Sequence, residues 1–353
     1  MFGGGKQADV IGSTKIDIGT EMASERNGVI ITKTTDNSTK YLNPVPSGST
    51  GYTTTPYISI GDEAGVYGGG KEADVLGDAT LNIGTKNLTD GTNITGNIFG
   101  GGYGSTTKVT GDVTVNIGKK TGNDTDGYTY AGYATITGDV YGGSAMGKVN
   151  TTDGTSANDG KSTNVNLYGG TVNGSIYGGG LGDNTSGSEV AANVYGPVTV
   201  TVEGGSATNV FGCNNKYGAP QQSTVIVNIN GTAEVGVGNV YGGGNLAAYA
   251  GSPVVTMNGG KAANVFGGGL SADVSGSVTV NMKGGTVTND VYGGGALANT
   301  NIGNTDDTSV NTTKVFLLGG TINNNVYGGG LGEKNLVNGK TADNPACSGK
   351  SLS

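Results

Sequence analysis

The sequence predicts an all-β fold, a parallel β-solenoid (β-helix) of about ten coils with variable loops. Two observations carry this prediction. A short word recurs in which an apolar residue is followed by an aromatic residue and a glycine, and eight of its ten copies continue as Gly-Gly-Gly. Segments of alternating apolar and polar residues precede these words, a pattern typical of strands that bury one face.

The aromatic residues of the repeated word lie between 25 and 65 residues apart. A constant word at variable spacing is expected when each coil has a fixed core and an optional loop. If the apolar residue before each ring points inward, the period of two along a strand points the ring outward. The ten rings are those of Phe2, Tyr67, Phe99, Tyr141, Tyr177, Phe211, Tyr241, Phe266, Tyr292 and Tyr327.

The alternating segments are clearest at residues 113–117 and 278–282. Within them, and in the copy at residues 225–229, we expect Val115, Val227 and Val280 to lie in one buried ladder. We expect Thr114, Thr279 and Asn228 to face outward, because side chains alternate between the two faces of a strand. Gly-Gly pairs follow several of these segments, and we expect them to turn a corner at positive φ.

Asparagine precedes several of the aromatic words, for example at Asn209, Asn239 and Asn264. It tolerates the left-handed region and so suits a bend, and its repetition predicts an amide ladder along the stack. We expect one repeat array over residues 1–332, with a loop or hairpin decoration at about residues 21–65 and a polar tail over residues 333–353.

The composition argues against several classes of function. The net charge is −8, Arg26 is the single arginine and histidine is absent. We therefore expect no nucleic-acid partner, which would need a clustered basic face, and no cofactor or metal. No apolar run approaches the roughly 18 residues that cross a bilayer, so we expect no membrane span in this piece.

Cys213 and Cys347 are expected to be unpaired. Their coils lie four rungs apart, or about 19 Å at about 4.8 Å per rung, whereas a disulfide joins Cα atoms within about 7 Å. The chain also begins inside a copy of the repeated word and without a signal-like segment. We therefore expect the signal and the anchor to lie outside it.

The Val-Tyr-Gly-Gly-Gly words joined to Val-Thr-Val-Asn segments resemble the glycine-rich β-strand repeats of large bacterial surface and autotransporter-type adhesins. The resemblance covers roughly residues 1–332. It implies a non-catalytic, extended repeat protein, extracellular or on the cell surface, that serves structural display and attachment. The partner implied is a glycan or a host or cell-surface polymer, with end-to-end or lateral self-association as a further expectation.

The candidate site is the stripe of aromatic rings. If exposed, ten rings would form an apolar stripe about 43 Å long, at about 4.8 Å per step, and such stripes mark ligand or assembly surfaces. The competing hypothesis is that loops or the core cover the rings, which the phenylalanines favour. The candidate ligand or assembly residues are Tyr67, Phe99, Tyr141, Tyr177, Phe211, Tyr241, Phe266, Tyr292 and Tyr327.

Two other functions remain as alternatives. A carbohydrate-active β-helix hydrolase needs two carboxylates at a fixed separation on one wall, but the outward strand positions carry threonine and asparagine, with Asp17 almost alone among acids. We therefore expect no enzyme and no catalytic residues. An ice-binding solenoid needs two flat rows of threonine, and here those rows are interrupted by asparagine, valine, isoleucine and lysine.

Overall fold

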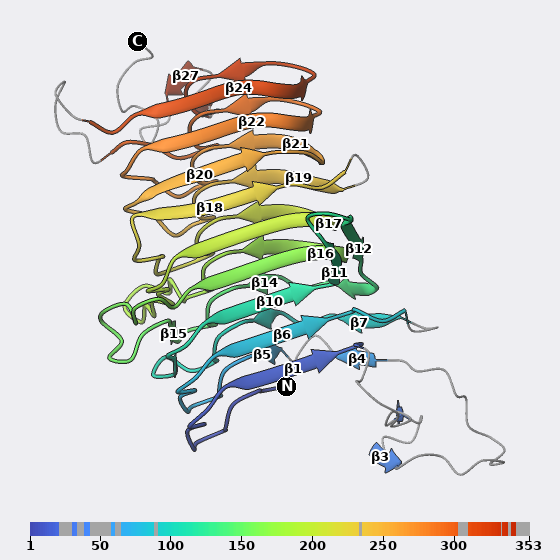
Figure 1. Cartoon of the computed structure of the whole chain (residues 1–353). Coiled ribbons are helices and arrows are strands. Elements are labelled where there is room, and N and C mark those ends of the chain that lie inside the picture. Colours follow the sequence, from blue (N-terminus) through green and yellow to red (C-terminus); the bar gives the residue numbers. More distant parts are fainter. Residues whose placement is uncertain are drawn as a thin grey trace.

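The structure, a computed structural model, describes residues 1–20, 30–33, 39–42, 58–60, 65–87, 91–232, 235–302, 310–332, 334–337 and 340–343. Every regular element in these ranges is a β-strand, and most of the strands belong to one large sheet. The fold is therefore all-β, as predicted. Figure 1 shows strands stacked in order along the chain, from β1 near the N-terminus to β24.

The strands fall into three columns, and within each column a strand pairs in parallel with its equivalents before and after it in the chain. We call one level of the stack a rung. The first column contains the alternating segments: β1 (Thr14–Ile18), β6 (Ala79–Ile83), β10 (Val113–Ile117), the first parts of β16 (Thr163–Tyr177) and β17 (Val198–Phe211), β18 (Thr224–Ile229), β20 (Ser252–Met257), and the first parts of β22 (Val278–Val287) and β24 (Thr313–Ile322).

The second and third columns follow the corner after each first-column strand. The second contains β4 (Ile58–Ile60), β7 (Thr92–Ile94), β13 (Ala134–Ile136), the start of β19 (Gly236–Tyr241) and the start of β21 (Lys261–Phe266), besides the later parts of β16, β17, β22 and β24. The third column contains the aromatic words: β5 (Val66–Tyr67), β8 (Ile98–Phe99), β14 (Val140–Tyr141), the ends of β16, β17, β19 and β21, β23 (Val291–Tyr292) and β25 (Val326–Tyr327).

The remaining strands lie outside these columns. β9 (Lys108–Val109) pairs in parallel with β15 (Lys148–Val149). Three antiparallel hairpins join β2 (Ile30–Lys33) to β3 (Thr39–Leu42), β11 (Lys119–Asn123) to β12 (Gly127–Ala131), and β26 (Lys334–Val337) to β27 (Lys340–Asp343). The segment at residues 21–65 thus contributes both a hairpin and the second-column strand β4.

Side-chain facing in the first column follows the sequence prediction. Val115, Val227 and Val280 are fully buried in one apolar cluster, and the neighbouring Thr114 and Thr279 are half-buried on the opposite face. A second apolar cluster joins the first residues of the first-column strands, such as Val113, to a row of buried valines that precede these strands in the chain, such as Val75. The sole cysteine in the described residues, Cys213, is buried there as a free thiol; Cys347 lies outside the described residues.

The corners confirm one expectation and correct another. The second glycine of the Gly-Gly pairs has positive φ at Gly170, Gly205, Gly285 and Gly320. The asparagines before the aromatic words do not: among the described non-glycine residues, only Asn150 and Asn301 have positive φ. The tolerance of asparagine for the left-handed region therefore does not explain its place at Asn209 and Asn239, whereas the predicted amide ladder is present, with Asn239 Nδ2 donating to Asn209 Oδ1 over 3.1 Å.

Short polar side chains also hold successive rungs together at the corners. The backbone N–H of Asp112 donates to Asp78 Oδ1, and that of Ser162 donates to Asp112 Oδ1, each over 2.8 Å. The same arrangement joins Asp139 to Asn97 and Ser175 to Asp139. These side chains satisfy N–H groups at bends, where parallel pairing between strands is interrupted.

The glycine words bring neighbouring rungs into close contact. A Cβ atom added at Gly142 would meet the carbonyl oxygen of Gly178 in the next rung, Thr163 Cγ2 at 2.7 Å and Val165 Cγ2 at 2.9 Å. The first glycine of most other words meets its successor in the same way. Only glycine fits here, because a side chain would point along the stack into the next backbone.

Val280→Asp is expected to lower the melting temperature strongly, because an unpaired carboxyl group in an apolar ladder costs at least the roughly 2–7 kcal/mol of an unpaired neutral polar group. Thr279→Asp, one residue away on the outer face and opposite Lys314, is expected to change the melting temperature little. Thermal unfolding followed by circular dichroism measures both, and equal losses would show that the assigned facing is wrong.

Gly142→Ala is expected to destabilise the fold by about 1–3 kcal/mol through overpacking. Gly328→Ala is the matched control, because Gly328 has the same place in the last described word and an added Cβ atom meets nothing within 4 Å. Chemical unfolding gives both free energies. Equal stability of the two variants would contradict the close-contact explanation for the glycine words.

Candidate functional site

The aromatic rings of the repeated words stack into one continuous column. Neighbouring centroids lie 4.6–5.0 Å apart and the ring planes are within 10° of parallel, from Phe2 to Tyr327. The rings form a cluster of their own, separate from that of the preceding valines. The predicted alternation, with valine on one side of the strand and the ring on the other, is therefore present.

Most of these rings are covered. Those from Phe99 to Tyr292 have exposed fractions of 6% or less, so their surfaces cannot form an open stripe for a ligand. The cover comes from small and aliphatic residues in the turns that follow the glycine words, including Ala145, Leu181 and Leu270. Of the expected stripe residues, Tyr67 is half-buried and Tyr327 is 43% exposed.

The N-terminal end of the aromatic column has an additional ring. Tyr103 packs edge-on against Tyr67 with centroids 5.5 Å apart, and against Phe2 at 6.5 Å. Tyr103 is 38% exposed and Phe2 is 37% exposed. Exposed aromatic surface in this column is therefore confined to its two ends.

Burial keeps the tyrosine hydroxyls of the column neutral, and that of Tyr141 has two hydrogen-bond partners. The Tyr141 hydroxyl donates to Asp139 Oδ2 over 3.0 Å and accepts from Asn215 Nδ2 over 2.7 Å. Burial raises the pKa of Tyr141, and the negative charge of Asp139 raises it further. Burial alone raises the pKa of Tyr241 to about 12. These hydroxyls are structural groups at neutral pH.

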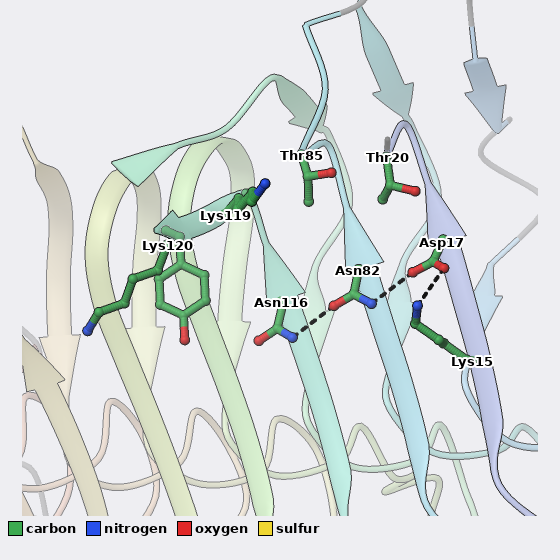
Figure 2. Close-up of a pocket in the computed structure, with 10 residues that line it drawn as sticks. Lys15, Asp17, Thr20, Asn82, Thr85, Asn116, Lys119 and Lys120 are labelled. Carbon is green, nitrogen blue, oxygen red and sulfur yellow. Dashed lines mark hydrogen bonds and ion pairs between the residues drawn. The ribbon is translucent and has the colours of Figure 1, made fainter. Parts of the chain in front are cut away.

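An open groove lined mostly by polar residues lies on the outer face of the first column. Its volume is about 460 Å³, and β1, β6, β10 and β16 form its floor together with the start of β11. The residues that line it are Lys15, Asp17, Thr20, Asn82, Thr85, Asn116, Gly118, Lys119, Lys120 and Tyr168. Figure 2 shows Asn116, Asn82 and Asp17 side by side on adjacent strands, with the lysines at both ends.

A one-way amide ladder crosses the groove floor. Asn116 Nδ2 donates to Asn82 Oδ1 over 2.9 Å, and Asn82 Nδ2 donates to Asp17 Oδ1 over 2.8 Å. Asn166, one rung further, donates to Asn116 over 2.9 Å. Asp17 sets this direction, because a carboxylate can only accept and so requires the NH₂ group of Asn82.

The charges in the groove are partly paired. Lys15 Nζ lies 2.9 Å from Asp17 Oδ2. Partial burial by itself raises the pKa of Asp17, but hydrogen bonds from Asn82 and Lys15 and the charge of Lys15 outweigh it, so this pKa is lowered. Asp17 is therefore ionised at neutral pH, and the acid that stood out in the sequence serves as the acceptor at the end of the ladder.

Lys120 anchors the β11–β12 hairpin to the stack. Its Nζ lies 3.0 Å from both carboxylate oxygens of Glu203 on β17 and 4.1 Å from the ring centroid of Tyr128. Burial acts to lower the pKa of Lys120, but the hydrogen bond and charge of Glu203 outweigh it and raise this pKa. The Glu203 side chain is 11% exposed, so the ion pair is screened less than a surface pair.

The sequence interpretation missed this groove. It did not predict the hairpin of β11 and β12 or the strand β13, which the structure places within residues 119–138. The alternation of Tyr128, Thr129 and Tyr130 after a turn-forming Asn-Asp-Thr-Asp-Gly segment was the available signal. The contact with Glu203, 83 residues from Lys120, had no signal in the local sequence.

Comparison with known proteins gives no relative: the chain matches no family model, no curated protein and no solved structure. Within the described residues, no group of three or more histidine, cysteine, aspartate or glutamate side chains could hold a metal ion. The described part of the chain also has no helix long and apolar enough to span a membrane.

The protein is expected to lose stability at alkaline pH through its buried tyrosines. Tyrosine in the unfolded chain ionises near pH 10, whereas the pKa of Tyr241 in the folded chain is about 12. The stabilisation is therefore complete below about pH 10 and is lost as pH rises through about 12. The midpoint of chemical unfolding is expected to fall less steeply between about pH 10 and 12 in Tyr241→Phe than in the wild type. The phenylalanine ring keeps the stacking in the column at neutral pH but has no hydroxyl to ionise. Identical slopes would contradict the raised pKa.

Proposed function

We propose that this chain is a parallel β-solenoid of about ten coils that acts as a non-catalytic, adhesin-like attachment protein. The observation that carries the proposal is the continuity of every column along one axis. Strand pairs, apolar residues, aromatic rings and corner side chains all repeat from rung to rung. Such a stack supports an elongated surface, on which binding groups can be displayed at intervals.

Attachment is favoured over catalysis because the carboxylates on the stack are already paired with other side chains. Asp17 is held by Lys15 and Asn82, and Asp112 is held by Lys161 and Ser162. A hydrolase of this architecture would need two free carboxylates facing a common substrate. The extracellular or cell-surface location and the glycan or surface-polymer partner follow the resemblance in repeat style, and they belong to this proposal.

The purified chain is expected to be retained on part of a panel of immobilised plant, algal and host polysaccharides, and to release no sugars from any of them. Retention is measured by depletion from solution, and cleavage by new reducing ends and unsaturated products, with heat-unfolded chain as the control. No retention on any polymer would overturn the attachment function. Product release that disappears in Asp17→Asn would establish an enzyme instead, and thermal hysteresis in freezing solutions would establish ice binding.

A further inference from the structure

The groove beside the β11–β12 hairpin differs from the rest of the first-column face. Elsewhere on that face the outward positions carry threonine, asparagine and apolar residues such as Ile226 and Phe316, whereas here a hairpin adds Lys119 and Lys120 beside the strands. The ion pair of Lys120 with Glu203 holds the hairpin against the stack. The hairpin therefore forms one side of the groove and is held in place by this ion pair.

The amides on its floor offer regularly spaced hydrogen-bonding groups. Asn82 and Asn116 each use one N–H and one carbonyl lone pair within the ladder. Each amide has a second N–H and a second lone pair, which are left for a ligand. A donor and an acceptor on one amide match two neighbouring hydroxyl groups of a sugar ring, and the rungs repeat every 4.8 Å or so, close to the length that one pyranose adds to an extended chain.

Two further groups define the ligand. Tyr168 on β16 lines the groove and is half-buried, so it can offer an apolar ring surface to the C–H face of a sugar. Lys119 is exposed and has no ion-pair partner among the described residues, while Lys15 and Lys120 pair with Asp17 and Glu203. A negatively charged ligand would supply the missing partner of Lys119.

We infer that this groove binds an extended acidic polysaccharide whose sugar rings carry carboxylate groups. The chain lies across β1, β6 and β10, its hydroxyls bind Asn82 and Asn116, and one carboxylate pairs with Lys119. Tyr168 contacts a ring at the end of the groove. This assignment rests on the proposed attachment function and gives that function a site and a ligand class.

Isothermal titration of the whole chain with a galacturonic acid oligosaccharide tests the assignment, with a neutral cello-oligosaccharide of equal length as comparison. The acidic probe is expected to bind more tightly, and added salt should weaken it. Lys119→Gln is expected to weaken acidic binding about threefold to fivefold, and Tyr168→Leu about threefold to tenfold. Lys283→Gln is the matched control, because Lys283 holds the position of Tyr168 in a distant rung and is exposed.

The possible outcomes distinguish a wrong binding site from a wrong attachment function. Equal binding of the acidic probe to wild type, Lys119→Gln and Tyr168→Leu, all with unchanged melting temperatures, overturns the groove while attachment stands. Equal binding of both probes, or retention only on polymers without carboxylates, overturns the acidic class. Absence of retention on every polymer in the panel overturns the attachment function itself. A loss confined to the two groove variants, with Lys283→Gln unchanged, establishes the site.

Discussion

Backbone contact along the stack at the glycine words is the constraint on which the rest of the structure depends. The N–H of Gly142 donates to the carbonyl oxygen of Tyr177 in the next rung over 2.9 Å, and an added Cβ atom at Gly142 would collide with that rung. Where these words meet, no side chain separates the rungs. The valine ladders and the aromatic column can then form at one spacing, because parallel strands fix the same distance for every column.

The distance between rungs determines which side chains can contact their equivalents in the next rung. Planar rings about one rung apart stack face to face, and an amide reaches the next amide directly, as between Asn239 and Asn209. Glycine-rich words lose more conformational entropy on folding than other sequences, by about 0.5–1 kcal/mol per residue relative to alanine. The buried ladders on either side of each word, such as Val210 and Phe211, offset that cost through apolar contact.

The features that repeat could be predicted from the sequence, and those that depend on an insertion could not. The facing of Val115, Val227 and Val280 followed from the period of two, and the corner at Gly170 followed from its Gly-Gly pair. The burial of the rings was one of two hypotheses that the sequence left open, because the period of two places the rings opposite the valines but does not say whether turns cover them. The groove depends on Lys120 meeting Glu203, a contact between distant rungs that no local pattern encodes.

A strictly repeated surface offers the same weak contact on every rung, so selective binding requires a place where the repeat is broken. In this chain the break combines the hairpin after β10 with a single carboxylate at the end of the amide ladder. Asp17 accepts from Asn82, which fixes the orientation of that amide and then of Asn116 and Asn166. The hydrogen bonds on the groove floor therefore all point the same way along the stack. A bound polysaccharide, which also has two different ends, would be held in one direction.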